Sequence, residues 1–104
     1  MRYPNTIQNL IECFKKLPGI GEKTAERYAL ATLDLDSEVI NLFSKSIADT
    51  KIKIRRCSIC NNLSEEDICD ICKSDSRNKK ILCVVEDPKS IMLFERLGTF
   101  NGCY

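Results

Sequence analysis

The sequence predicts a small α+β protein built from several modules, and three features carry this prediction. Amphipathic helical patterns fill the first half, four cysteines then fall within sixteen residues, and a short apolar run precedes one more helical pattern. We expect a helical region at 1–56, a four-cysteine module at 57–73 and the first βα unit of an α/β domain at 79–104.

Composition narrows the class of protein. Hydrophobic residues make up 43% of the chain and charged residues 30%, which is typical of a soluble globular protein. No apolar run approaches the ~18 residues that a membrane span requires, and residues 1–5 lack the apolar core of a secretory signal. We therefore expect a cytoplasmic protein, in which clustered cysteines favour a metal over disulfides.

Charge is distributed unevenly although the net charge is only +1. Residues 1–56 contain ten Lys and Arg against seven Asp and Glu, whereas residues 57–104 contain six against eight. If the protein binds a polyanion, the first half is the better candidate.

Helical periodicity is clearest in the first half, where apolar side chains recur at spacings of three and four residues. The predicted helices span 6–17, 22–33 and 36–50. Asn5 or Thr6 is expected to cap the first helix, and Pro18–Gly19 to end it. The side chains expected to face inward are Ile7, Leu10, Ile11, Phe14 and Leu17, then Ala25, Tyr28, Ala29 and Leu33, then Val39, Ile40, Phe43 and Ile47.

The last part of the chain predicts one strand and one helix. Ile81–Val85 is typical of a strand buried on both faces, and 100–104 of the start of another. Asp87–Pro88 predicts the start of a helix that ends before Gly98. Because the edges of a single strand need neighbours, we expect the opening unit of a larger domain, and hence an N-terminal fragment or a truncated protein.

Four cysteines form the strongest chemical signal, with the pattern Cys57-x2-Cys60-x8-Cys69-x2-Cys72. Each two-residue gap lets both sulfurs face one ion, and four thiolates suit a closed, structural Zn²⁺ site. The spacer is expected to form a small hairpin, and metal binding, worth on the order of 10–16 kcal/mol, to replace a hydrophobic core. An iron–sulfur cluster, disulfides or a redox pair are the alternatives. The other cysteines are expected to be small apolar side chains: Cys13, Cys83 and Cys103.

A turn with two glycines, Gly19 and Gly21, separates the first two predicted helices. Glycines allow a tight hairpin with positive φ and let the backbone approach a phosphate, which the following helix N-terminus favours. Ile20 is expected to plug into the helical core, and Lys23 and Arg27 to share one helical face. The pattern predicts a clamp for the DNA backbone that reads no base edges, with a plain helix–helix turn as the alternative.

A second basic cluster consists of Lys51, Lys53, Arg55 and Arg56, whose alternation with isoleucine fits a helix end or a strand. It is either a further contact to the phosphate backbone or a solvated surface.

Glu86 follows the apolar run 81–85, where open α/β sheets place their sites. Together with Asp87 it could contribute to a Mg²⁺ site, although no further acidic partners follow. The alternative is that Asp87 caps a helix and Glu86 is solvated.

The chain resembles the bacterial RecR family of recombination proteins, because three features follow one another in the same order: Leu17–Gly21, the four-cysteine motif and Cys83–Pro88. The resemblance covers the whole chain, which matches the N-terminal half of that family. The resemblance implies a helix-hairpin-helix DNA-binding motif, a zinc module and the start of a Toprim-like domain. It matches the hairpin glycines to Gly19 and Gly21, DNA contacts to Lys23 and Arg27, zinc ligands to the four cysteines, and the first acidic Toprim position to Glu86. The remaining acidic motif and the C-terminal segment of the family are absent.

The resemblance further implies a non-enzymatic factor of recombinational DNA repair, associated with the nucleoid during repair. It would act with RecO and RecF to help load recombinase on single-stranded DNA, as a homo-oligomer, either a dimer or a ring tetramer. Leu10 and Phe14 become candidates for a subunit interface. Two other functions stay open: a fragment of a Toprim-type Mg²⁺-dependent nuclease, primase or topoisomerase, or a zinc-scaffolded protein-interaction module.

Overall fold

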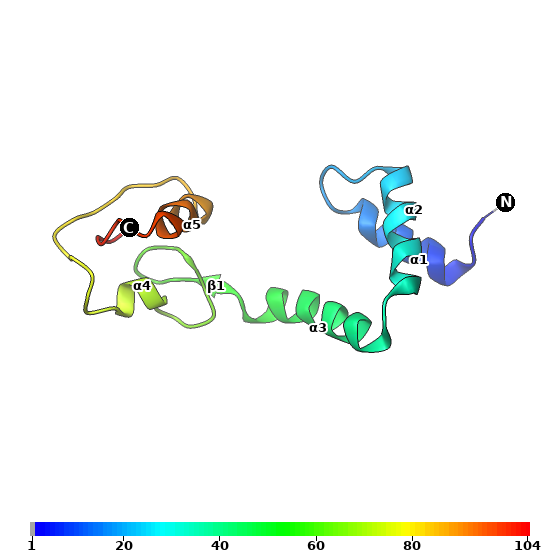
Figure 1. Ribbon diagram of the computed structural model, residues 1–104, viewed down its shortest axis with the longest axis horizontal. Helices are drawn as coiled ribbons and strands as arrows, with labels where there is room; N and C mark the ends of the chain where they lie inside the picture. The colour runs from blue at the N-terminus through cyan, green and yellow to red at the C-terminus, as the bar shows by residue number, and fades with distance from the viewer. Residues whose placement is uncertain (1) are drawn as a thin grey trace. The chain divides into compact units, whose positions relative to one another are not determined.

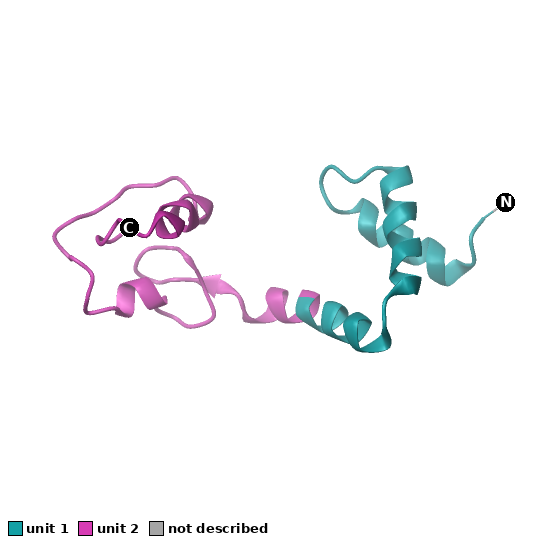
Figure 2. Cartoon of the chain, in the orientation of Figure 1, with its two compact units in different colours: residues 1–46 teal, residues 47–104 magenta. Residues whose placement is uncertain are grey.

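The computed structural model describes residues 2–104, which form helices and one small sheet (Figure 1). These residues divide into two compact units, one up to Ser46 and the other at Ile47–Tyr104 (Figure 2). This mixed content confirms the predicted α+β class. No helix within residues 2–104 is long and apolar enough to cross a membrane. The elements are α1 (Asn5–Lys15), α2 (Glu22–Ala31), the 3-10 helix η1 (Thr32–Asp34), α3 (Ser37–Lys53), β1 (Arg55–Arg56), β2 (Leu63–Ser64), α4 (Asp70–Lys73) and α5 (Pro88–Leu97).

The core of the first unit lies between α1 and α2. Ile11 is fully buried there against Ala25 and Ala29, whose small side chains allow the two helices to approach closely. Phe14 and Tyr28 add an edge-to-face ring contact, with centroids 5.8 Å apart. The partly buried side chains around this core are Tyr3, Ile7, Leu10, Phe14 and Ile20.

The start and end of α1 differ from the prediction. Pro4 is the N-cap, no side chain caps the helix, and the Pro4 carbonyl accepts a hydrogen bond from Gln8 N at 3.0 Å. The expected cap by Asn5 or Thr6 is therefore wrong, because the helix begins one residue earlier and places Asn5 inside its first turn. Leu17 is 53% exposed since it lies in the turn after α1, so its predicted inward position is also wrong.

The predicted inward face of α3 is largely exposed. Val39, Phe43 and Ile47 are 44%, 51% and 62% exposed, and α3 contains no buried residue. Leu33 is exposed as well, because α2 tightens into η1 before that position. The periodicity is real, but within residues 2–104 no other helix packs closely along α3 to cover it.

A two-stranded antiparallel sheet begins the second unit, pairing Arg55 with Ser64 and Arg56 with Leu63. The pattern of the segment Lys51–Arg56 fitted either a helix end or a strand, and the segment contains both. Its first part ends α3 and its last part forms β1. At the other end of the unit, Asp87 Oδ1 accepts a hydrogen bond from Ser90 N at 3.1 Å and caps α5. Gly98 ends α5 with a φ of 71°, as predicted.

The apolar run 81–85 does not form the strand buried on both faces that was predicted. One parallel bridge joins Leu82 to Cys103, with Cys83 N donating to Cys103 O and Cys103 N to Ile81 O, each at 2.8 Å. Leu82 is 67% and Val84 86% exposed. A buried strand needs partners on both edges and layers on both faces, and among residues 2–104 this run has one paired segment.

Arg77 ties the segment before this run to the end of the chain. It pairs with Glu95 and donates to the carbonyl oxygens of Phe100 and Gly102 at 3.2 and 3.3 Å, while Tyr104 Oη donates to Glu95 at 2.6 Å. The hydrogen bond from Arg77 lowers the pKa of Glu95, and burial together with the Glu95 carboxylate raises the pKa of Tyr104 to about 12. The sequence pattern indicated only a polar linker here, because its partners lie far along the chain.

We expect Ile11→Ala to destabilise the first unit by about 2–5 kcal/mol, because it leaves a cavity in the α1–α2 core. Thermal unfolding followed by circular dichroism measures the loss. Leu42→Ala is the matched control, since Leu42 is 67% exposed and its truncation creates no cavity. Equal destabilisation by both substitutions would contradict this assignment of the core.

We expect Arg77→Lys to loosen the C-terminal segment, because a single ammonium cannot replace the planar guanidinium that serves Glu95 and two carbonyls. The amides of Asn78 and Cys103, which donate to Asn101 O and Ile81 O, should exchange with solvent at least about tenfold faster. Lys80→Gln, an exposed cation three residues away, should leave these exchange rates unchanged.

Candidate zinc centre and nucleic-acid interface

The four predicted ligands converge at one place in the second unit. The Sγ atoms of Cys57, Cys60, Cys69 and Cys72 all lie within 4.8 Å of one another, and those of Cys60 and Cys69 are 3.6 Å apart. Four sulfurs held about 2.3 Å from a tetrahedral Zn²⁺ would lie about 3.8 Å from each other, so the cluster fits one zinc ion. Such a site has no open position, which makes the metal structural.

Short-range hydrogen bonds shape the turn that carries the first two cysteines. Cys57 N donates to Asn62 O at 2.7 Å and Asn61 N to Cys57 O at 2.9 Å. Asn61 adopts a φ of 66°, a left-handed conformation that asparagine tolerates better than most residues. The strands β1 and β2 flank this turn on either side. The expected hairpin within the eight-residue spacer is thus wrong in detail, because the spacer supplies only β2 and its partner strand precedes Cys57.

The second pair of cysteines is held by the single turn of α4, with Cys69 as its N-cap and Cys72 inside it. Backbone N–H groups of Cys69 and Ile59 point at Cys57 Sγ, at 3.3 and 3.4 Å. Burial by itself raises the pKa of Cys57, but its hydrogen bonds with backbone N–H groups outweigh this and lower the pKa to about 6. Burial raises the pKa of Cys60 and of Cys72. Four thiolates this close repel one another, and a dication compensates that repulsion.

The two glycines between α1 and α2 play different parts. Gly19 has a φ of 81°, which only glycine adopts at little cost. Gly21 is the N-cap of α2 with a φ of −88°, so the predicted positive φ holds for Gly19 alone. A Cβ on Gly21 would meet nothing within 4 Å, which leaves the backbone there open to a ligand. Ile20 packs against the helical core, as expected.

The N-terminus of α2 offers donors for an anion. The first helical hydrogen bond is from Ala25 N to Gly21 O at 3.0 Å, so the preceding N–H groups have no acceptor within the helix. Lys23 and Arg27 are exposed on α2 and make no ion pair among residues 2–104, although Arg27 lies over the Tyr28 ring with its Cζ 5.7 Å from the centroid.

Lys15 also contributes to the charge at the N-terminus of α2, which the sequence pattern did not indicate. Its Nζ lies 2.6 Å from Glu22 and 3.5 Å from Glu12, and the hydrogen bond with Glu22 raises the pKa of Lys15. Glu22 is the only acidic residue in the first turn of α2. Lys15 therefore offsets the carboxylate that would otherwise repel an anion at this helix end. An acidic first residue with a lysine across the turn is the signal that could have found the pair.

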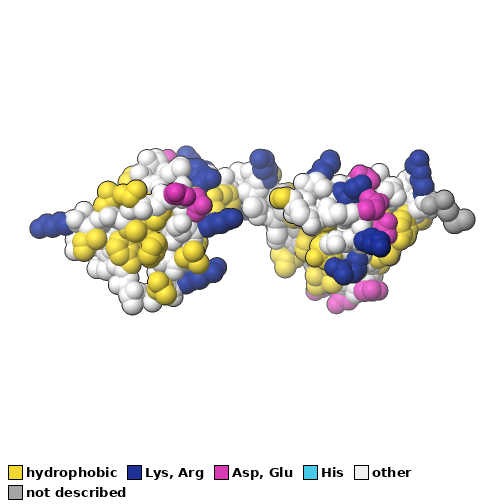
Figure 3. Space-filling view, turned by 90° about the horizontal axis from the view of Figure 1, so that it is seen from above, with side chains coloured by type: hydrophobic (Ala, Val, Ile, Leu, Met, Phe, Trp, Pro, Cys, Tyr) yellow, Lys and Arg dark blue, Asp and Glu magenta, His cyan; other side chains and the backbone are white. Residues whose placement is uncertain are grey.

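The second basic cluster is partly used inside its own unit. Lys53 lies 3.8 Å from Asp49, Arg55 3.3 Å from Asp67, and Arg56 donates to Asn61 O at 3.3 Å. Lys51 makes no ion pair in the described part of the chain. Figure 3 shows Lys and Arg side chains on the surface of both units, interspersed with acidic ones. Within the described residues, unpaired cations next to free amides are thus a feature of the glycine turn and α2.

Glu86 is exposed, and the structure gathers no acidic site around it within residues 2–104. The cysteine cluster is the one group of three or more metal-ligating side chains that these residues bring together. Asp87 caps α5, which was the structural alternative for that residue. The assignment of Glu86 to a Toprim acidic position stays a prediction.

Comparison with known proteins finds matches to the regions that contain both sites. The family model described as RecR, helix-hairpin-helix, matches residues 7–51, and the RecR model for a zinc finger domain with four cysteines matches residues 54–74. The chain belongs to the RecR family. The convergent sulfurs and the zinc-finger match together identify one structural zinc ion as the cofactor of this RecR chain.

Individual relatives agree along the whole chain. It is 46% identical to the recombination protein RecR of Lactobacillus johnsonii and 45% identical to that of Enterococcus faecalis, in each case over all 104 residues and 52% of the relative. The chain therefore spans about half the length of the curated RecR proteins it matches.

We expect Cys69→Ser to abolish stoichiometric zinc binding and to unfold the β1–β2 hairpin, because the hairpin has almost no core of its own. Native mass spectrometry measures the zinc content, and circular dichroism the remaining helices of α1 and α2. Cys13→Ser is the matched control, since Cys13 is an exposed cysteine outside the cluster. Full zinc content in the Cys69→Ser protein would contradict the four-sulfur site.

Proposed function

We propose that this chain is the DNA-binding part of a non-enzymatic factor in recombinational DNA repair. The observation that carries the proposal is the glycine turn, where free amides, an open backbone at Gly21 and two unpaired cations lie together. The match of this region to the helix-hairpin-helix model supports it, and so does the name of the relatives, recombination proteins rather than enzymes.

In the proposed mechanism, a phosphate oxygen accepts hydrogen bonds from the N–H groups that begin α2. Gly21 lets the phosphate approach the backbone, while Lys23 and Arg27 supply charge from the same helical face. Since none of these groups reads a base edge, binding is independent of DNA sequence. Lys51 and its neighbours in the second basic cluster add contacts that are weaker, because internal partners already engage several of them.

The zinc centre has a structural role in this proposal. Four thiolates around one dication leave a net charge of about −2, which makes the module a poor phosphate ligand. It holds the hairpin and α4 in a fixed arrangement within the second unit, so that the unit offers a stable surface.

The finer functional assignments rest on the resemblance to the whole family. We infer that the complete protein acts with RecO and RecF at the nucleoid and helps load recombinase on single-stranded DNA. We also infer a homo-oligomer, a dimer or a ring tetramer, to which Leu10 and Phe14 contribute from the partly buried side of α1.

We expect Lys23→Ala combined with Arg27→Ala to weaken binding to a labelled oligonucleotide at least about tenfold, and to reduce the slope of log K against log[salt] by about 2. Fluorescence anisotropy at several salt concentrations measures both. Lys45→Ala combined with Lys89→Ala removes the same charge from exposed positions outside the turn and should change affinity much less. Unchanged affinity of the variant with both substitutions would contradict the proposed clamp. A strong preference for one DNA sequence over a scrambled one would contradict it as well.

We expect Gly21→Thr to weaken DNA binding at least about fivefold while leaving the unfolding temperature nearly unchanged. Threonine caps helices about as well as glycine, and the space at this position is open, so the fold tolerates it. Its side chain nevertheless blocks the backbone approach that the clamp requires. Gly19→Thr should do the reverse and destabilise the first unit, because of the φ of 81°. DNA affinity and thermal stability measured on the same samples distinguish the two glycines.

A further inference from the structure

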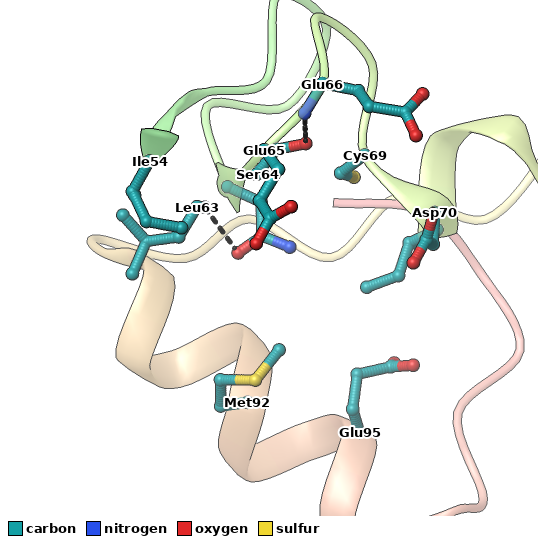
Figure 4. A pocket seen from close by; sticks show the side chains of 11 residues that line it. Ile54, Leu63, Ser64, Glu65, Glu66, Cys69, Asp70, Met92 and Glu95 are labelled. Carbon is teal, nitrogen blue, oxygen red and sulfur yellow. Dashed lines mark hydrogen bonds between the residues drawn. The ribbon is translucent and has the colours of Figure 1, made fainter. Parts of the chain in front are cut away.

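A groove of about 560 Å³ lies within the second unit, between the zinc module and α5. Met92 and Glu95 rise from α5 on one side, and Leu63 and Asp70 lie across from them (Figure 4). Its volume is in the range of about 300–1,000 Å³ that is usual for binding sites. The complete lining is Ile54, Asn62, Leu63, Ser64, Glu65, Glu66, Cys69, Asp70, Ile71, Met92 and Glu95.

Three large apolar side chains of the lining, which we call the floor of the groove, are open to solvent. Ile54, Leu63 and Met92 are 38%, 52% and 43% exposed, although each is a large hydrophobic side chain. Methionine adapts its shape to different ligands, which suits a surface that receives an extended chain. This floor therefore offers contact area to an apolar side chain.

All charged side chains that line the groove are acidic, and we call them its rim. Four carboxylates line it and no lysine or arginine does. Glu66 pairs with Lys73, and Glu95 with Arg77, but both cations lie outside the lining.

Two of these carboxylates make no close ion pair, although Lys73 lies near enough to Asp70 for its charge to act on it, and Lys53 and Arg55 line a neighbouring hollow with Glu65. Glu65 and Asp70 make no ion pair within residues 2–104, and both are exposed. Cys69 also lines the groove, so the zinc-bound thiolates add negative charge to one wall. The groove therefore attracts cations, with two carboxylates left to receive them.

We propose that this groove binds a segment of a partner protein in which lysine or arginine alternates with large apolar residues. The apolar stems and neighbouring side chains would lie on Ile54, Leu63 and Met92, and the cationic tips would reach Glu65 and Asp70. The groove belongs to a different unit from the proposed DNA clamp and is opposite to it in charge.

Other ligands fit this groove less well. The negative rim repels nucleic acid and anionic lipid. A lone divalent cation needs carboxylates that converge, and the rim carboxylates do not form such a group in the described part of the chain. The carboxylates instead lie among and beside the apolar side chains of the lining, an arrangement that suits a peptide that is both basic and apolar (Figure 4).

The test uses the zinc-loaded 104-residue chain and a fluorescein-labelled peptide in which lysine and leucine alternate. Anisotropy measures binding, and the methyl resonance of Met92 should shift in NMR spectra on titration. Two control peptides separate the contributions: one replaces every lysine with glutamate, the other every leucine with serine. We expect both controls to bind at least about tenfold more weakly.

Matched variants locate the site. Glu65→Gln with Asp70→Asn should weaken binding of the lysine–leucine peptide about tenfold, and Met92→Ser about fivefold, with zinc content unchanged. Asp75→Asn with Glu86→Gln removes the same charge from exposed positions of the same unit outside the groove, and should change affinity less than about twofold.

Equal losses in the two charge variants, or equal binding of the lysine–serine peptide, would show general charge attraction and overturn the proposal. Absence of peptide binding at low salt would overturn it as well. If native mass spectrometry shows that the groove variants change the subunit number, a second copy of the chain occupies the groove and the proposal is wrong. DNA affinity of the groove variants should be unaltered.

Discussion

The convergence of four sulfur atoms is the constraint on which the second unit depends. Its two strands contain two residues each, and its α4 helix contains four, lengths that do not persist in water without support. Cys57 and Cys69 are two of the few buried residues of this unit, so metal ligands make up a substantial part of its small interior. The zinc ion therefore supplies the cohesion that a hydrophobic core supplies elsewhere. Because Cys69 also lines the acidic groove, the same ion fixes the shape of that surface.

Packing of apolar side chains between α1 and α2 holds the first unit together. The glycine turn that joins these helices is the place where the unit exposes bare backbone. Ile11, Ala25 and Ala29 close the interface of α1 with α2, and Ile20 fastens the turn to this core. The turn can then present bare backbone without losing its shape. Gly19 is needed for the fold because of its left-handed φ, whereas the fold makes no such demand at Gly21. In the proposed clamp, the missing side chain at Gly21 lets a phosphate come close to the backbone.

Local signals in the sequence predicted much of the local structure, although not the cap of α1. The cysteine spacing, the Asp87 cap and the Gly98 stop each depend on residues within one turn or loop, and the structure confirms all three. Features that depend on distant partners were not predictable in this way. The exposed positions of Phe43 and Val84 depend on whether another element covers them, which periodicity cannot show. Arg77 finds its partners 18 and more residues further along the chain, so it resembled any other polar linker residue.

Pairing, rather than net charge, decides where each unit can bind a charged ligand. A net charge of +1 suggests no partner, and the basic cluster at 51–56 would look like the strongest anion site from composition alone. In the structure, however, much of that cluster is engaged by Asp49, Asp67 and a backbone carbonyl. Lys23 and Arg27, which make no ion pair within residues 2–104, lie on α2 beside the glycine turn. Glu65 and Asp70, which make none within these residues either, line a groove together with apolar side chains. At the two proposed sites, unpaired charge lies next to a second complementary surface, which is free amides in the first unit and apolar side chains in the second. This combination is what separates a proposed binding site from a solvated face.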